Sequence, residues 1–220
     1  MFDNGQVFAP HRSAGVFATE TGLGSRRGYR AWKRVFDVAG GLALLVLMLV
    51  AASVLLILNP FFNTGSLFYM QDRMGRGCEK FTAIKFRTML AEETTQRGAF
   101  DALEHHRITG LGRFLRRSRI DELPQAINVL VGDMSLIGPR PDFYPHAMVY
   151  LDGVPGYRDR HAMRPGISGF AQIKHGYIEG IEGVRRKVRA DLQYAARASV
   201  AFDLWIAWQT VKVILGRKGM

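Results

Sequence analysis

The sequence predicts a mixed α/β protein, mostly helical, in which a membrane helix near the N-terminus precedes a small globular domain with short strands. Three observations predict this class. One apolar segment is long enough to enter a bilayer, the strand-like runs are short, and two segments with helical spacing close the chain. The 220 residues fit one domain plus an appendage, and a hydrophobic fraction of 48% excludes a disordered chain.

The apolar segment covers residues 38–58 and contains no charged side chain. A helix of this length reaches about 32 Å, close to the thickness of a bilayer's hydrocarbon core. A buried core helix would carry a polar stripe, and a signal peptide would have a shorter apolar run. We therefore expect a flexible basic tail over residues 1–30, a membrane helix over 31–62 and a globular domain over 63–220.

The charges around this segment bear on whether it crosses the membrane. Six Lys and Arg residues precede it and 24 follow it, so both flanks are basic. Basic flanks prefer the cytoplasmic side, which favours a re-entrant helix that dips into the membrane and returns. A spanning helix is the alternative, because long domains weaken the charge rule.

The rest of the chain predicts a few short elements. Residues 67–70 and 81–89 are strand-like, and turn formers separate them. Residues 110–131 predict a helix, a turn and a second helix. Two more helices are expected over 184–198 and 200–216.

The last of these helices places Trp205 and Trp208 beside apolar residues, with cationic residues at its end. This pattern is typical of an amphipathic helix lying at a membrane interface. It is equally typical of a core helix that uses tryptophan as filler, and the sequence leaves both interpretations open.

The net charge of +11 and the pI near 10.2 predict an anionic partner, which could be nucleic acid, anionic lipid or a phosphorylated substrate. Cys78 is the one cysteine, which excludes an internal disulfide and any C-x-x-C metal site. The Walker A, G-x-G-x-x-G and H-E-x-x-H motifs are all absent from the sequence. Nucleic-acid binding lacks a recognisable motif or an aromatic platform, so we expect no nucleic acid.

Residues 115–141 are the densest in chemistry, because a carboxylate pair, Asp121-Glu122, follows several arginines and precedes Arg140. One interpretation is structural: Asp121 caps a helix that starts near Leu123, and Glu122 complements its dipole. The other is chemical. Arginines bind phosphate, and a carboxylate among them could hold Mg²⁺ or attack phosphorus as a nucleophile. Lys85 and Arg87 form a second basic cluster, expected on one face of a strand.

In these residues the chain resembles the bacterial sugar transferases, the small monotopic phosphoglycosyl transferases that start exopolysaccharide and O-antigen assembly. The resemblance covers about residues 33–216. It rests on nine short blocks in the same order, at residues 33–37, 71–75, 85–89, 107–109, 121–125, 128–130, 132–135, 138–141 and 164–169.

The resemblance implies an activity. Such enzymes move a sugar 1-phosphate from a UDP-sugar to a polyprenyl phosphate such as undecaprenyl phosphate, releasing UMP. It also implies that Asp121 attacks the β-phosphorus to form a covalent phosphosugar, and that Glu122 holds Mg²⁺. The remaining expected substrate ligands are Lys85, Arg87, Arg119, Pro139, Arg140, Pro141 and Arg164.

The resemblance further implies a place in the cell: the bacterial inner membrane, with membrane lipid around the helix and the catalytic domain on the cytoplasmic face. Members of the family usually break the apolar segment at a proline, but residues 49–54 contain none, and only Ser53 could loosen the helix there. A non-enzymatic membrane adaptor that binds anionic lipid is the alternative function. Neither the sugar nor the oligomeric state follows from the motifs.

Overall fold

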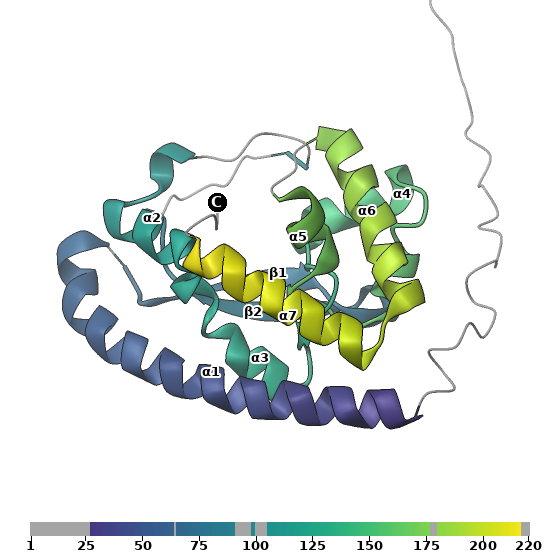
Figure 1. Ribbon diagram of the computed structural model, residues 1–220. Coiled ribbons are helices and arrows are strands. Elements are labelled where there is room, and N and C mark those ends of the chain that lie inside the picture. The colour runs from purple at the N-terminus through teal and green to yellow at the C-terminus, as the bar shows by residue number, and fades with distance from the viewer. Residues whose placement is uncertain (1–26, 64, 91–97, 100–104, 177–179, 217–220) are drawn as a thin grey trace, which may run out of the picture.

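The computed structural model describes residues 27–63, 65–90, 98–99, 105–176 and 180–216. Figure 1 shows the globular part of the chain seated along one long helix, α1 (Arg27–Phe62), with α3 directly on it and the β1–β2 hairpin behind α7. The chain is mostly helical with a few short strands, which confirms the predicted class.

Helix α1 begins earlier than expected. Arg27 to Arg30 are helical, although we assigned them to the tail, because Tyr29 stacks on Trp32 and its hydroxyl donates a 2.9 Å hydrogen bond to Asp203. The rest of the predicted tail, 1–26, lies outside the described residues. Among the described residues, α1 is the one helix long and apolar enough to cross a membrane. Only 17% of its most apolar 18-residue stretch is buried. This degree of exposure argues against a core helix.

The helix is continuous through residues 49–54, where the resemblance implies a break. It curves along its length (Figure 1), and the Ser53 hydroxyl donates to the Leu49 carbonyl at 3.0 Å, a bond that bends helices slightly. One stripe faces the domain: Asp37, Gly41, Met48, Leu55 and Asn59, spaced four or seven residues apart. The opposite face exposes leucines, valines and phenylalanines.

Strands β1 (Phe68–Met74) and β2 (Lys80–Phe86) form an antiparallel hairpin in which Tyr69 pairs with Lys85. The 3₁₀ turn η1 (Arg76–Cys78) joins them, with Gly77 at φ 68°. Both predicted strands are confirmed, but the second ends at Phe86. Arg87 therefore lies one residue beyond the strand.

The predicted helix–turn–helix is confirmed as α2 (Gly110–Arg117), the 3₁₀ turn η3 (Ile120–Glu122) and α3 (Gln125–Val131), after the short turn η2 (His105–Arg107). A second, parallel pair of strands was not expected from the sequence. It joins β3 (Ser135–Ile137) to β4 (Gly166–Ser168). Between them and after them lie α4 (Tyr144–Gly153), η4 (Asp159–Ala162) and α5 (Phe170–His175).

Helices α6 (Gly180–Arg197) and α7 (Val200–Leu215) confirm the two predicted C-terminal helices. Helix α7 has one face typical of a core helix and another typical of an amphipathic helix, the two alternatives that the sequence left open. Asp203 and Ile206 are fully buried on one face, whereas Trp205 and Trp208 are 43% and 58% exposed on the other. An exposed apolar face with tryptophans is what an interfacial helix presents to lipid.

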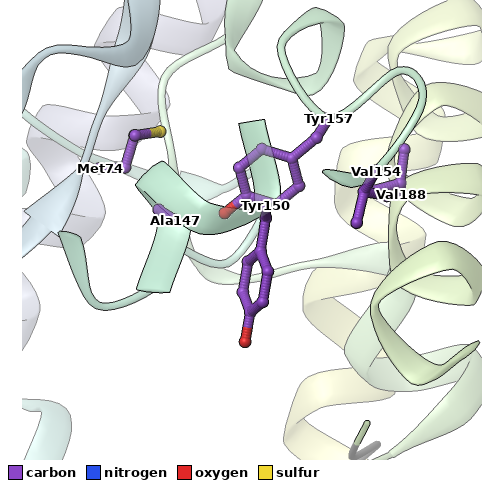
Figure 2. Close-up of a cluster of buried hydrophobic side chains, with 6 residues drawn as sticks. All are labelled: Met74, Ala147, Tyr150, Val154, Tyr157 and Val188. Carbon is purple, nitrogen blue, oxygen red and sulfur yellow. The ribbon is translucent and has the colours of Figure 1, made fainter. Parts of the chain in front are cut away.

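Three apolar clusters hold the domain together. Figure 2 shows the first, in which Met74 from the hairpin, Tyr150 from α4, Tyr157 and Val188 from α6 pack together. The second joins Met48 and Leu55 of α1 to Phe86 of β2 and Leu115 of α2. The second cluster matters for the site, because it packs the strand and the helix that flank the carboxylate pair onto the same long helix.

Candidate functional site

The carboxylate pair sits on η3, between two helices. Thr109 caps α2 by accepting a 2.9 Å hydrogen bond from the Gly112 amide, and Arg119 then adopts a left-handed conformation at φ 60°. This conformation is uncommon outside glycine, and it separates the end of α2 from the turn that leads to Pro124, the N-cap residue of α3. As a result Asp121 and Glu122 are both buried, with 7% and 5% of their surface exposed.

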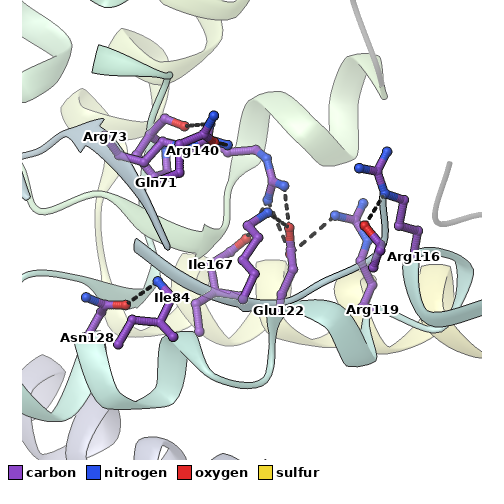
Figure 3. Close-up of polar contacts among 12 residues, drawn as sticks. Gln71, Arg73, Ile84, Arg116, Arg119, Glu122, Asn128, Arg140 and Ile167 are labelled. Atoms are coloured by element: carbon purple, nitrogen blue, oxygen red, sulfur yellow. Dashed lines mark hydrogen bonds and ion pairs between the residues drawn. The ribbon is translucent and has the colours of Figure 1, made fainter. Parts of the chain in front are cut away.

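Three basic side chains converge on Glu122, as Figure 3 shows. Lys85 Nζ lies 3.0 Å from Oε1, and Arg119 Nη1 lies 3.5 Å from Oε2. Arg140 contacts both oxygens, with Nη1 3.3 Å from Oε2 and Nη2 against Oε1. Burial alone would raise the pKa of Glu122, but Arg140, Lys85 and Arg119 outweigh it and hold the pKa well below its usual value.

Lys85 reaches Glu122 because the edge of β2 is tied to α3. The Asn128 side chain accepts from the Ile84 amide at 3.2 Å and donates to the Thr82 carbonyl at 2.8 Å, as a neighbouring strand would. Burial and the charge of Arg140 lower the pKa of Lys85, against the opposing effect of Glu122.

Arg140 is positioned by the loop that follows β3. The backbones of Gly138 and Gly166 approach so closely that a Cβ on Gly166 would lie 2.1 Å from the Gly138 nitrogen. Fully buried Arg160 then donates a 2.7 Å hydrogen bond to the Arg140 carbonyl. Asp191 and Asp142 hold the same guanidinium at 2.7 and 2.9 Å, which anchors the loop to α6.

Asp121 differs from its neighbour. Its Oδ1 is buried and has no hydrogen-bond partner among the described residues. Burial, together with the charge of Glu122, raises the pKa of Asp121 to about 6, so the carboxylate is still mostly ionised at neutral pH. A buried, ionised carboxylate with an unused oxygen surrounded by cations has the properties of a nucleophile for phosphorus.

The structural interpretation of Asp121 as a helix cap is wrong. Helix α3 begins at Gln125, its N-cap residue is Pro124, and no side chain caps it. Asp121 instead lies inside the 3₁₀ turn that follows the left-handed Arg119.

Two expected substrate ligands lie apart from this cluster. Arg87 donates to Ser66, with Nε 2.8 Å from the backbone carbonyl, and its guanidinium lies over the Tyr69 ring. Arg164 is exposed and lies near Gly132, at the far end of α3. Pro139 and Pro141 are buried; their carbonyls accept hydrogen bonds from the Gly166 amide and from Arg73.

Sequence reasoning missed three residues that build the site: Arg73, Asn128 and Arg160. Arg73 lines a small cavity together with Lys85, Arg140 and Gln125. Alternation along β1 places Arg73 on the same face as Tyr69, which pairs with Lys85, so the hairpin register could have found it. No local signal marks Asn128 or Arg160, because the contacts through which they build the site are distant in the chain: Asn128 bonds to Thr82, and Arg160 bonds to Asp142.

The oxygen atoms of the carboxylate pair suit Mg²⁺ as ligands, because this ion commonly binds one or two carboxylates together with substrate phosphates. The described residues contain no group of three or more His, Cys, Asp or Glu side chains that could hold a metal by themselves. Asp121 and Glu122 supply adjacent carboxylates, and Oδ1 of Asp121 has no hydrogen-bond partner among the described residues. The pair therefore fits an ion that arrives with an anionic substrate.

Comparison with known proteins gives one family. Residues 28–217 match the family model described as "Bacterial sugar transferase". The chain is 38% identical over 191 residues to a UDP-N-acetylgalactosamine-undecaprenyl-phosphate N-acetylgalactosaminephosphotransferase of Aeromonas hydrophila, covering 85% of this chain and 44% of the relative. It is 36% identical to a UDP-glucose:undecaprenyl-phosphate glucose-1-phosphate transferase of Caulobacter vibrioides, covering 83% and 67%.

A third relative has a similar length. The exopolysaccharide production protein PSS of Rhizobium leguminosarum bv. phaseoli is 34% identical over 185 residues, which cover 81% of this chain and 92% of that protein. The chain thus spans less than half of the Aeromonas relative and nearly all of the Rhizobium one.

Proposed function

Because this chain belongs to the bacterial sugar transferase family, we propose that it transfers a sugar 1-phosphate from a UDP-sugar to undecaprenyl phosphate or a similar polyprenyl phosphate, releasing UMP. This would be the first membrane step of exopolysaccharide or glycoconjugate synthesis. One observation carries the proposal. A buried carboxylate with an unused oxygen, Asp121, adjoins a cluster of cations suited to a diphosphate.

The first half-reaction follows from the chemistry of this pair. An Oδ atom of Asp121 attacks the β-phosphorus, and the bond from that phosphorus to the bridging oxygen breaks. UMP leaves with the electron pair, and the sugar phosphate stays on Asp121 as an acyl phosphate. Lys85, Arg119 and Arg140 offset the charge on the phosphoryl oxygens and on the leaving group.

In the second half-reaction Asp121 is the leaving group instead of the nucleophile. A phosphate oxygen of the polyprenyl phosphate attacks the same phosphorus, and the bond to the Asp121 oxygen breaks, which restores the carboxylate. Division into two steps lets a soluble donor and a lipid acceptor use one site in turn. The burial of Asp121 limits access of water to the acyl phosphate between the two steps.

Mg²⁺ belongs to the proposal as an ion that binds with the donor. Glu122 would hold it through a carboxylate oxygen, beside Asp121, and the ion would neutralise charge on the diphosphate. Until the ion binds, Lys85, Arg119 and Arg140 contact the Glu122 carboxylate and keep it ionised and oriented.

We also propose that the protein sits on the cytoplasmic face of the bacterial inner membrane without crossing it. Both ends of α1 are bound to the same domain. Near the start, Arg34 donates to the Val129 and Leu130 carbonyls at 2.8 and 2.7 Å. At the end, Asn63 donates to the Arg87 carbonyl at 3.1 Å and accepts from Thr109 at 2.5 Å.

A helix that crossed a bilayer would separate its ends by about 30 Å of hydrocarbon, and one domain could not bind both. The contacts therefore support an arrangement in which both ends of α1 stay on one side of the membrane, as in the re-entrant alternative, although α1 curves continuously and has no break. The exposed apolar face of α1 and the exposed tryptophans of α7 would then meet lipid and hold the site at the level of the acceptor's phosphate.

The test uses the full chain in membranes with undecaprenyl phosphate and a panel of UDP-sugars, with UMP release as the readout. We expect release with at least one sugar, and labelled donor without acceptor should leave its label on Asp121. Asp121→Asn should show neither, whereas the exposed Asp152→Asn serves as the matched control. An adaptor that only binds anionic lipid would release no UMP from any donor.

A further inference from the structure

A hollow of about 570 Å³ lies at the outer edge of β1 and is not used by the proposed chemistry. Its volume falls within the range of ~300 to 1,000 Å³ typical of small-molecule sites. Three aromatic side chains line it together with polar groups: Tyr69, Phe143, Tyr144, Gln71, Asp72 and Thr82. Aromatic rings with a few hydrogen-bonding groups fit a planar, polar ring as ligand.

The hollow adjoins the cation cluster through Arg73. This side chain lines the small cavity that it shares with Lys85 and Arg140, and its guanidinium donates to Gln71, which lines the hollow. Arg73 also pairs with Phe143 through a single β-bridge. Figure 3 shows Gln71 and Arg73 beside Arg140, with Arg116 and Arg119 on the opposite side of Glu122.

Arg73 itself indicates an anion. Its two described hydrogen-bond acceptors are neutral, the Pro141 carbonyl at 3.1 Å and the Gln71 amide oxygen. Within the described part of the chain it forms no direct ion pair, although the side chain is half-buried and the charges of Asp142 and Glu122 act on it. A half-buried guanidinium that donates hydrogen bonds only to neutral groups has capacity for a phosphate oxygen.

We infer that this hollow binds the nucleoside of the donor, with Arg73 holding the phosphate next to it. The inference rests on the proposed function and extends it. In phosphoryl transfer the attacking and leaving oxygens lie roughly in line. Lys85 and Arg140 contact Glu122 beside Asp121 and also line the small cavity with Arg73, so a diphosphate held by these cations would direct its UMP end toward Arg73 and the hollow.

The side chains suit a pyrimidine base. Tyr69 lies on the Lys85 face of the hairpin, and the Arg87 guanidinium, bound to Ser66, lies 5.8 Å from the centre of its ring. Arg87 thus orients a stacking platform instead of binding phosphate. Because Arg73 occupies the oxygen of Gln71, the amide nitrogen of Gln71 can donate to a carbonyl oxygen of the base.

The test separates the base from the phosphates by inhibition with two probes, UMP and pyrophosphate. Tyr69→Ala should raise the KM for the UDP-sugar and the Ki for UMP roughly tenfold, since base–aromatic stacking is lost, with kcat and pyrophosphate inhibition unchanged. Tyr69→Phe should restore both values. Arg73→Gln should weaken inhibition by UMP and by pyrophosphate together, and Arg73→Lys should recover part of each.

Met148→Ala is the control, because Met148 is exposed on α4, the helix of Tyr144, and does not line the hollow. An unchanged UMP inhibition in Tyr69→Ala overturns the inference. So does a change in preference between two UDP-sugars without a change in UMP inhibition, which would place the sugar in the hollow. If the wild-type protein turns over no UDP-sugar at all, the proposed function fails instead, and direct binding of labelled UMP to Tyr69→Ala still decides the role of the hollow.

Discussion

Asp121 and Glu122 are neighbours on one 3₁₀ turn and are both buried, yet three basic side chains contact Glu122, whereas Oδ1 of Asp121 contacts no hydrogen-bonding group among the described residues. The two pKa values move in opposite directions for this reason. Glu122 orders the cations, and Asp121 keeps an oxygen available for reaction. The first two predictions follow from this asymmetry.

Asp121→Asn should abolish turnover and also stabilise the protein. A carboxyl whose pKa is raised by folding costs stability at every pH above its unfolded value, so removing the charge should increase the free energy of unfolding by roughly 1 to 3 kcal/mol at pH 7.5. The gain should shrink as the pH falls from about 6 to 4, where wild-type Asp121 becomes protonated. Thermal unfolding at several pH values measures it, and a destabilised Asp121→Asn would contradict the inference that the buried charge of Asp121 costs stability.

Glu122→Gln should act in the opposite sense and destabilise the fold by about 2 to 4 kcal/mol at pH 7.5. The change leaves the cations of Lys85, Arg119 and Arg140 packed together without their carboxylate. The pKa of Glu122 is lowered by folding, so its stabilising contribution is present at neutral pH and is lost on acidification. Denaturant unfolding of Glu122→Gln and of the exposed control Asp152→Asn tests this; equal stabilities would show that the cluster is not a source of stability.

The rate should depend on pH through Asp121. With its pKa raised to about 6 by burial and by Glu122, the nucleophile becomes protonated below that pH, and kcat/KM should fall about tenfold per pH unit there. UMP release between pH 5 and 8 gives the profile, with circular dichroism confirming that the protein remains folded. A limb centred near pH 4 would mean that the group behaves as an exposed carboxyl.

Arg160 should position the phosphate site without touching substrate. Arg160→Lys keeps the charge but loses the planar contact to Asp191, Asp142 and the Arg140 carbonyl. We expect a drop of tenfold or more in kcat/KM and weaker inhibition by pyrophosphate, because Arg140 loses its backbone support. Arg158→Lys, on the exposed side of the same segment, is the matched control. Lower thermal stability with unchanged pyrophosphate inhibition would assign Arg160 a structural role only.

The topology can be tested with single cysteines. Cys78 is the one native cysteine, so Cys78→Ser provides a background for Ser13→Cys in the N-terminal tail and Arg158→Cys in the domain. Since both ends of α1 bind the domain, an impermeant maleimide should label both positions from the cytoplasmic side only. Labelling of Ser13→Cys from the periplasm alone would establish a spanning helix.

Local pattern accounts for much of the fold. The apolar run predicts α1, two strand-like runs predict β1 and β2, and helical spacing predicts α2, α3, α6 and α7. The same reasoning missed the β3–β4 pair, because two three-residue strands carry too little periodicity to be seen. It also ended the second strand three residues too late, at 89 instead of Phe86, so Arg87 lies beyond the strand, with its guanidinium over the Tyr69 ring.

By itself the sequence determined that a long apolar helix precedes a basic domain, and that Asp121 and Glu122 are adjacent carboxylates among arginines. Both conclusions depend only on residues that are neighbours in the chain, so they do not require knowledge of the tertiary structure. Only the tertiary structure decided that Lys85 and Arg140 meet at Glu122, that Arg73 rather than Arg87 or Arg164 joins them, and that both ends of α1 bind one domain. Such contacts join residues far apart in the chain, and they exist only because packing of the hairpin, the β3 loop and α1 brings distant backbone segments to a fixed separation.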